Sequence, residues 1–274
     1  MIQFLKEGDD LSVLTGSVVA GVDVGSLSTE VVLMNQEGDY QYIVLPTGAN
    51  SKTAAKKAMD QALQQIGYEL EQLSFVLATG YGRISIPFAD KRVTEITCHG
   101  KGAHYLYPSA STVIDIGGQD SKVIRLSPQG KVLDFVMNEK CAAGTGRFLE
   151  VMTRTLEVEL ADMEKLSRKA REAVPISSMC TVFAESEVVS LIAEGHPVEE
   201  IIRGIHDSIA DRTVGMVNRV GLEKDLVMTG GVAKNGGVVE CLQERLGIAI
   251  NLPEEPQIVG ALGAALLASR EAFS

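Results

Sequence analysis

The feature that most constrains the fold of this chain is a short pattern that occurs twice: two strands joined by a glycine-containing turn. Residues 18–34 and 112–126 both read as an apolar strand, a turn with glycine and a second apolar strand. The two segments align without gaps, and the corresponding pairs are Asp23 with Asp115 and Gly25 with Gly117. Such a repeat predicts two lobes built on one plan. Chance similarity of two short hairpins is the alternative, and the recurrence of the carboxylate and the glycine in register weighs against it.

The repeat also predicts where the chain divides. We expect residues 1–110 to form the first lobe, with residues 1–16 as an extra N-terminal segment, and residues 111–274 to form the second lobe. Strand patterns alternate with helical patterns, which is typical of the α/β class. One of the helices is expected at 51–66, where alanines recur at helical spacing behind Ser51 as a possible cap.

Composition excludes several classes of protein. The chain of 274 residues carries 25 basic and 36 acidic residues, a formal net charge of -11. A surface for nucleic acid would need clustered Lys and Arg, so no nucleic-acid partner is expected. No apolar run approaches the roughly 20 residues that cross a bilayer, and the N-terminus does not read as a secretion signal. We therefore expect a soluble cytoplasmic protein without a membrane partner.

The glycine turns have the character of a phosphate site. Backbone N–H groups in such a turn can approach phosphate oxygens, because glycine adds no side chain. Asp23 and Asp115 are predicted to hold Mg²⁺ through water, since that ion keeps much of its hydration. Gln119 lies just past the second turn, where its amide is placed to orient an attacking water. The chain has no G-x-x-x-x-G-K-[ST] motif, which excludes a P-loop, and no dinucleotide fingerprint follows the first strand.

These motifs resemble a known family. Two D-x-G turns and a T-G-G turn are similar to those of the actin, Hsp70 and sugar-kinase fold, and longer stretches narrow the match: GVDVGS, LATGYGR, VIDIGGQDSK, MNEKCAAGTGRFLEVM, SSMCTVFAESEVVS, MTGGVAKN and GALGAALLA. Together, over about residues 18–270, they resemble the ATPase activators of 2-hydroxyacyl-CoA dehydratases. That family includes ATPase subunits of benzoyl-CoA reductases and the reductases of double-cubane cluster proteins.

The resemblance implies a two-lobed ATPase that binds ATP, ADP and Mg²⁺. Asp115 and Gln119 are then the expected catalytic residues. Carried over motif by motif, the expected nucleotide-binding residues are Asp23, Gly25, Ser26, Thr29, Gly117, Gly118, Lys122, Gly230, Gly231, Val232, Asn235 and Gly260. The loop at 79–83 also looks functional, but the sequence assigns no role to Arg83.

Two of the four cysteines are candidate metal ligands. Cys141 and Cys180 each stand before a segment of helical pattern, and the partial positive charge of a helix N-terminus favours a thiolate. One chain supplies two thiolates whereas a cubane cluster takes four, so a symmetric dimer would complete the set. A cluster on all four cysteines of one chain is the weaker alternative. We expect Cys98 and Cys241 to be buried structural residues, and the four histidines to lie at the surface or at helix ends.

The resemblance implies more about these cysteines. In such activators one [4Fe-4S] cluster lies at the homodimer interface, with two cysteines from each subunit. The protein is then an oxygen-sensitive electron donor of anaerobic metabolism, which couples ATP binding and hydrolysis to one-electron reduction of a partner iron–sulfur enzyme. A ferredoxin or flavodoxin would be the reductant. The alternatives are a small-molecule kinase, which shares the phosphate hairpins but needs no such cysteines, and a nucleotide-dependent assembly or chaperone protein, which would need longer insertions.

Overall fold

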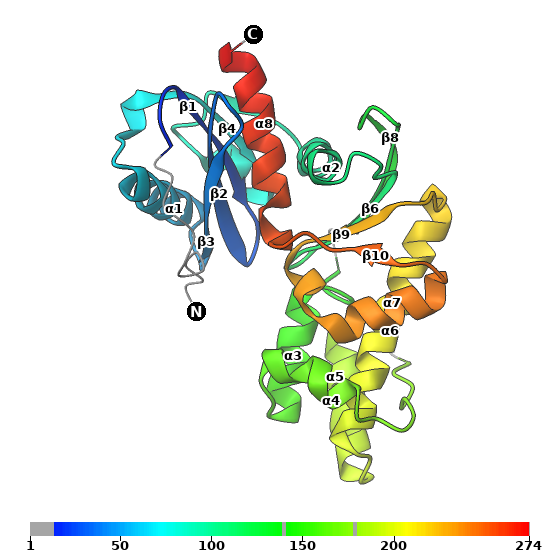
Figure 1. Cartoon of the computed structure of the whole chain (residues 1–274). Helices are drawn as coiled ribbons and strands as arrows, with labels where there is room; N and C mark the ends of the chain where they lie inside the picture. Colours follow the sequence, from blue (N-terminus) through cyan, green and yellow to red (C-terminus); the bar gives the residue numbers. More distant parts are fainter. Residues whose placement is uncertain (1–13, 139–140, 178–179, 274) are drawn as a thin grey trace. The chain divides into compact units, whose positions relative to one another are not determined.

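The structure is a computed structural model that describes residues 14–138, 141–177 and 180–273 (Figure 1). Most of the predicted N-terminal segment 1–16 therefore lies outside the described residues. The chain forms two compact units: unit 1 is made of residues 1–109, 128–132 and 257–274, and unit 2 of residues 110–127 and 133–256. The assignment of the two lobes to residues 1–110 and 111–274 stays a prediction.

Each unit contains a five-stranded sheet, and the two sheets repeat one strand order. In unit 1 the order is β3 (Tyr40–Pro46), β2 (Ser28–Asn35), β1 (Val18–Val24), β4 (Leu73–Thr79) and β5 (Lys91–Arg92). In unit 2 the order is β8 (Val132–Asn138), β7 (Ser121–Leu126), β6 (Thr112–Ile116), β9 (Leu226–Thr229) and β10 (Ile250–Asn251). In both sheets the middle strand runs antiparallel to its hairpin partner and parallel to its other neighbour. The predicted repeat is confirmed.

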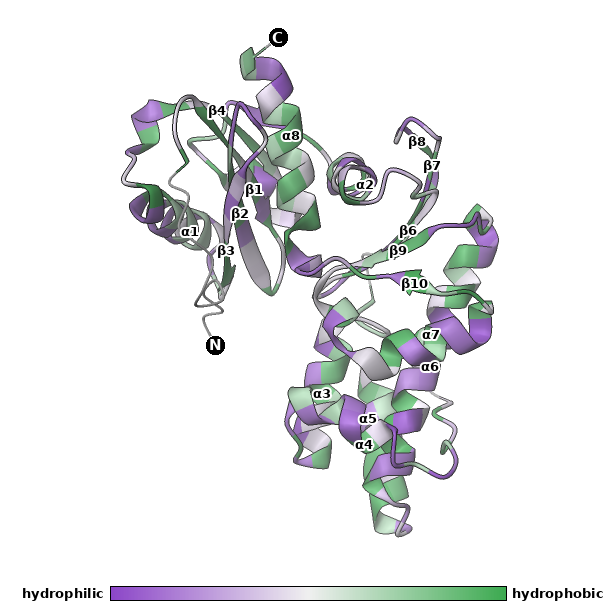
Figure 2. Ribbon diagram, in the orientation of Figure 1, coloured by the Kyte–Doolittle hydropathy of each residue, from purple (hydrophilic) through white to green (hydrophobic). Residues whose placement is uncertain are grey.

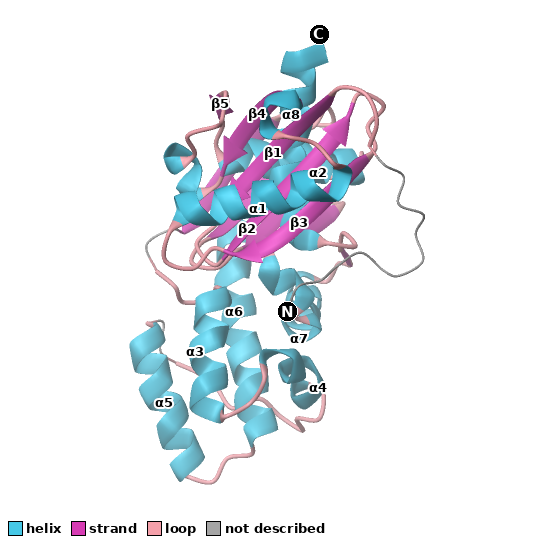
Figure 3. Ribbon diagram, turned by 90° about the vertical axis from the view of Figure 1, so that its left-hand side faces the viewer, coloured by secondary structure: helices cyan, strands magenta, loops and turns pink. Residues whose placement is uncertain are grey.

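The sheet of unit 1 is covered by a helix on each face (Figure 3). Alternate side chains of β1 point to opposite faces: Val18, Ala20 and Val22 pack in the core under α1 (Ser51–Ile66), whereas Val19 packs in the core under α8 (Val259–Phe273). The predicted helix at 51–66 is confirmed, but its predicted cap is wrong. The cap is Asn50, whose side chain accepts from the N–H of Thr53 at 3.0 Å, because Ser51 already lies inside the first turn.

Two helices of unit 1 cross at van der Waals distance because glycines remove the side chains between them. The first is α2 (Glu95–Leu106), and the second is α8. A Cβ on Gly263 would collide with the carbonyl oxygen of Cys98, and one on Gly102 would collide with that of Val259. Both clashes are with backbone atoms, which cannot turn aside as a side chain can. The small residues of GALGAALLA therefore shape a helix crossing.

Unit 2 is largely helical beyond its sheet. Its core joins apolar residues of β6, β7 and β9 to the helices that follow them. These helices are α3 (Gly146–Leu156), α4 (Met163–Ser167), α5 (Thr181–Ala193), α6 (Val198–Val220) and α7 (Gly236–Leu246). Short 3₁₀ turns complete the two units: η1 (Leu70–Gln72), η2 (Tyr81–Ser85), η3 (Leu160–Asp162), η4 (Gly231–Lys234) and η5 (Pro256–Ile258).

The longest of these helices, α6, is amphipathic. The four residues Ile201, Ile202, Ile205 and Ile209 form a fully buried apolar stripe, and Figure 2 shows hydrophobic and hydrophilic residues alternating along the helix. Among the described residues, no helix combines the length and the apolar character needed to span a membrane.

A pair of Gly→Ala variants tests the helix crossing. Gly263→Ala places a methyl group against the backbone of α2, so the free energy of unfolding should fall by about 1–3 kcal/mol. Gly215→Ala is the matched control, since no atom lies within 4 Å of the added Cβ in the interior of α6. It should raise the unfolding free energy by about 0.5–1 kcal/mol. Urea denaturation measures both, and equal effects of the two variants would rule out the close crossing.

Candidate functional site

The first glycine turn, between β1 and β2, is closed by its own backbone. The N–H of Gly25 donates to the carbonyl of Ser28 at 2.9 Å, and the hydroxyl of Thr47 donates to the carbonyl of Gly25 at 2.9 Å. Thr29 lies behind the turn, fully buried, with its hydroxyl 2.8 Å from that of Thr47. The hydroxyl of Ser26 is buried and has no hydrogen-bond partner among the described residues. The turn therefore offers an unused hydroxyl and bare glycine backbone.

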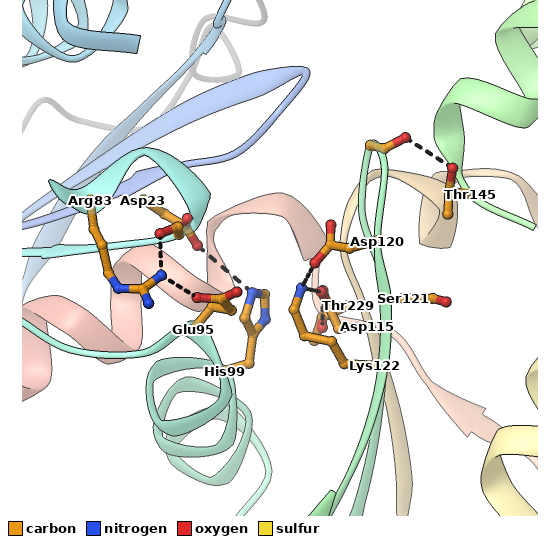
Figure 4. Close-up of polar contacts among 12 residues, drawn as sticks. Asp23, Arg83, Glu95, His99, Asp115, Asp120, Ser121, Lys122, Thr145 and Thr229 are labelled. Atoms are coloured by element: carbon orange, nitrogen blue, oxygen red, sulfur yellow. Dashed lines mark hydrogen bonds and ion pairs between the residues drawn. The ribbon is translucent and has the colours of Figure 1, made fainter. Parts of the chain in front are cut away.

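Asp23 lies at the start of this turn, between two glycines and beside His99, and Figure 4 shows the carboxylate with the histidine. A Cβ on Gly80 would collide with its Oδ1, and a Cβ on Gly260 would collide with its Oδ2. His99 of α2 lies beside it, with Nε2 3.7 Å from Oδ2. The side chain of Asp23 is only 9% exposed. The predicted residues Asp23 and Gly260 are thus brought together, and Gly260 is needed to make room for the carboxylate.

The second glycine turn, between β6 and β7, holds its aspartate with two donors. Lys122 Nζ lies 2.8 Å from Asp115 Oδ2, and the hydroxyl of Thr229 donates to Asp115 Oδ1 at 2.8 Å. Lys122 also pairs with Asp120. Burial by itself lowers the pKa of Lys122, but the carboxylates of Asp115 and Asp120 raise it well above its ordinary value. The lysine is therefore charged, and it forms an ion pair with the buried Asp115.

The same turn is joined by hydrogen bonds to the start of α3. The N–H of Gly146 donates to the carbonyl of Gly117 at 2.9 Å, and the N–H of Arg147 donates to that of Gly118 at 2.8 Å. The hydroxyl of Thr145 lies 3.0 Å from the carbonyl of Gly118 and 2.6 Å from that of Ala142. Gln119 is exposed at the tip of the turn. The carbonyl groups of the turn therefore satisfy the free N–H groups at the N-terminus of a helix.

The third turn follows β9. Gly230 has φ 84°, a conformation that favours glycine, and a Cβ there would lie 2.9 Å from Asp115 Oδ1. Gly231 is exposed, whereas Val232 is buried in the core of unit 2. The side chain of Asn235 accepts from the first N–H groups of α7, at 3.1 and 3.3 Å, so it caps that helix. Val232 and Asn235 therefore support the turn with their side chains.

A fourth turn of the same kind follows β4. The sequence marked this loop as functional, but its equivalence to the turn at Gly230 was missed. Gly80 has φ 83°, nearly that of Gly230, and each glycine follows a threonine that is in register with an aspartate. The N–H group of the Arg83 guanidinium donates to the carbonyl of Gly80 at 2.7 Å and pairs with Glu95 at 3.0 Å. Arg83, left without a role by the sequence, thus fixes this turn. The signal was present in the sequence, where a strand ends in Thr-Gly in both FVLATG and LVMTG.

The two candidate cluster cysteines are the accessible ones. Cys180 is exposed, and it is the N-cap of α5 without a side-chain cap bond. Cys141 is partly exposed, and its carbonyl accepts from the side chain of Asn138 at 2.8 Å. The expectation that a helix starts directly after Cys141 is wrong, because a turn through residue 145 intervenes and α3 begins at Gly146. The other two cysteines are buried, and burial raises the pKa of Cys98 and of Cys241 to about 12, so both stay protonated thiols.

The expectation that all four histidines lie at the surface or at helix ends is wrong for two of them. His99 and His206 are buried, not at the surface or at a helix end. Burial, helped by the charge of Arg203, lowers the pKa of His206 from 6.5 to about 4, and its ring lies 3.3 Å from the Asn235 amide that caps α7. The uncharged imidazole is therefore part of the packing behind the third turn.

The lowered pKa of His206 predicts how the stability of the protein depends on pH. Because its folded-state pKa lies below 6.5, the unfolded chain binds a proton that the folded chain does not, and stability falls as the pH drops from about 6.5 towards 4. Between pH 7 and pH 5 the loss should be about 2 kcal/mol. Urea denaturation at both pH values measures it. The variant His206→Gln should lose less stability over the same interval, and an equal loss in the two proteins would contradict the assignment.

Comparison with known proteins agrees with the repeat and the turns. A model of the BadF/BadG/BcrA/BcrD ATPase family matches residues 20–268. The activator of lactoyl-CoA dehydratase from Anaerotignum propionicum is 48% identical over 248 residues, which is 90% of this chain and 96% of the relative.

Solved structures give the same result. Component A of (R)-2-hydroxyglutaryl-CoA dehydratase from Acidaminococcus fermentans superposes with a TM-score of 0.90 at 44% identity, over 94% of this chain and 100% of that one. The activator of 2-hydroxyisocaproyl-CoA dehydratase from Clostridium difficile, with bound ADPNP, gives 0.87 at 41% identity over 93% and 95%. A glucokinase of the ROK family from Streptomyces griseus, at 13% identity and a TM-score of 0.57, shares the fold alone. The predicted sugar-kinase-like ATPase fold is confirmed.

Proposed function

Because the chain belongs to the BadF/BadG/BcrA/BcrD ATPase family, a family of activating ATPases, we propose that it is an ATP-dependent electron donor to a partner iron–sulfur enzyme. The observation that carries this proposal is the set of hydrogen bonds between the glycine turn at 117–118 and the segment that follows Cys141. It gives a direct physical connection between a candidate phosphate site and a candidate cluster ligand.

The names of the relatives indicate the acceptor. Relatives at 41–48% identity are described as activators of dehydratases that act on lactoyl-CoA, 2-hydroxyisocaproyl-CoA and (R)-2-hydroxyglutaryl-CoA. We therefore propose a 2-hydroxyacyl-CoA dehydratase as the acceptor of this chain. A benzoyl-CoA reductase or double-cubane component is the other candidate acceptor, and a ferredoxin or flavodoxin is the proposed reductant.

The turns fit ATP and magnesium. The hydroxyl of Ser26 has no hydrogen-bond partner among the described residues, so it can donate to a phosphate oxygen. The backbone at Gly25, Gly117 and Gly118 carries no side chains, so phosphate oxygens can approach it closely. Asp23 and Asp115 are the proposed carboxylates for Mg²⁺, through water. The exposed amide of Gln119 is proposed to orient the attacking water. The remaining nucleotide-binding residues are proposed as before: Thr29, Lys122, Gly230, Gly231, Val232, Asn235 and Gly260.

In this proposal nucleotide binding is transmitted through Thr145. A phosphate that shifts the turn at Gly118 also shifts the helix N-terminus bonded to it, because three donors of residues 145–147 end on the two carbonyl groups of the turn. The hydroxyl of Thr145 is shared with Ala142, the residue directly after Cys141. Helix α3 in turn packs on α5, which begins after Cys180. Both cysteines therefore lie on elements that respond to the turn.

The two cysteines also fit half of a cluster site. Both thiols are free and accessible, and Cys180 is the N-cap residue of α5. Glu187 accepts from the N–H of Ser177 at 2.9 Å and from its hydroxyl at 2.7 Å, which anchors the chain before Cys180. A [4Fe-4S] cluster takes four thiolates, so we propose that a second copy of the chain supplies the other two. When bound, the cluster supplies the single electron that the acceptor receives.

The surface beside Cys180 supports this dimer. Helix α5 exposes apolar side chains directly after the cysteine: Val182 is 65% exposed, Phe183 68% and Val189 53%. Apolar side chains at this exposure mark interaction surfaces when they gather on one element. A two-fold axis next to the helix would cover them and bring the cysteines of two copies together.

Cysteine variants test the proposal. Anaerobically prepared or reconstituted protein should contain about two iron atoms per chain, which corresponds to one four-iron cluster shared by two chains. Cys141→Ala and Cys180→Ala should each lose the iron and the visible absorbance, while ATP binding stays nearly unchanged because the glycine turns are intact. Cys241→Ala is the matched control and should keep the iron, since its buried thiol stays protonated.

Two different results would contradict the proposed function. A colourless, iron-free native protein after reconstitution would exclude the electron donor and leave the small-molecule kinase as the better explanation. Iron that survives in Cys141→Ala while ATP binding is lost would reverse the roles assigned to the turn and the cysteine.

A further inference from the structure

The second glycine turn carries a carboxylate of its own. The carbonyl of Asp120 accepts from the N–H of Gly117 at 3.0 Å, which closes the turn. A Cβ on Gly117 would lie 2.8 Å from Asp120 Oδ1, so the carboxylate lies directly against the bare backbone of that glycine. This is the backbone that a phosphate would approach. An anionic group of the protein therefore already lies at the place where an anionic ligand is expected.

The same carboxylate shares a lysine with Asp115. Lys122 contacts both aspartates, and Figure 4 shows it between them. The side chain of Asp115 is 3% exposed and is held at both oxygens, by Lys122 and by Thr229. The side chain of Asp120 is 26% exposed. Of the two partners of Lys122, Asp120 is thus the one that an incoming anion can displace at low cost.

Comparison with the first turn shows that the carboxylate of Asp120 is particular to the second turn. Register and turn closure place Ser28 where Asp120 stands, and Glu30 where Lys122 stands. Ser28 is uncharged, and its hydroxyl accepts from the side chain of Gln257 at 3.3 Å. The repeat therefore does not need a carboxylate at this position to form the turn. Closure of the turn therefore does not explain why residue 120 carries a charge, because the neutral Ser28 occupies the same position in unit 1.

We propose that Asp120 competes with the phosphate groups of ATP for Lys122 and for the backbone of Gly117, and so limits nucleotide affinity at the second turn. This inference rests on the proposed function, which places phosphate there. A carboxylate that returns to Lys122 when phosphate leaves also favours release of the products of hydrolysis. The competition acts on phosphate alone, so it should be absent for adenosine.

The test is the affinity of full-length protein for ATP and adenosine, measured by titration calorimetry with and without Mg²⁺. Asp120→Asn keeps the size and the backbone acceptor but removes the charge, and it should tighten ATP binding by about tenfold, since like charges placed side by side are strongly unfavourable. Adenosine affinity should not change. Asp162→Asn is the control: it makes the same change of charge at an exposed position of unit 2, and it should leave both affinities as they are.

Four results would overturn the proposal. Unchanged ATP affinity in Asp120→Asn would show that the carboxylate does not compete. Weaker ATP binding only when Mg²⁺ is present would show that Asp120 is a cation ligand. An equal gain for adenosine and ATP would place its effect away from the phosphates. Native protein that binds no ATP at all would overturn the proposed function as well, which separates the two failures.

Discussion

One set of hydrogen bonds connects the candidate phosphate site to the helical part of unit 2: the bonds between the carbonyl groups of Gly117 and Gly118 and the N-terminus of α3. Free N–H groups at a helix start must find acceptors, and here the acceptors belong to a glycine turn that has no side chains of its own to interfere. The turn and the start of the helix therefore form one hydrogen-bonded unit. Because the chain between Cys141 and this helix is held through Thr145 and Ala142, the cysteine is tied to the same unit of structure.

The repeat makes this arrangement possible, and the differences between its halves give it function. Both sheets place an aspartate at the end of the middle strand and a Thr-Gly turn on the neighbouring strand. In unit 1 the aspartate lies among glycines and beside His99, whereas in unit 2 a buried lysine fixes it. Only the second turn continues into a helix start that follows a cysteine. The two units therefore share one strand arrangement and differ in the residues that surround their aspartates.

Much of the fold was predictable because it follows from local periodicity. The paired hairpins and the helix at 51–66 both follow from apolar spacing, and the structure confirms each. The errors arose where tertiary contacts decide. The start of α3 at Gly146 and the burial of His99 depend on partners distant in sequence. No spacing along the chain records these contacts, so sequence alone located the turns but not their internal bonds.

The most direct test of the central claim is the reduction potential of the proposed cluster, measured with and without ATP in native protein and in Thr145→Val. Removing this hydroxyl breaks its bonds to Gly118 and Ala142 but leaves the backbone bonds of the turn and both cysteines in place. ATP should lower the potential of the native protein by about 100 mV, roughly 2.3 kcal/mol for one electron, and by clearly less in the variant. An identical shift in both proteins would contradict coupling through the glycine turn.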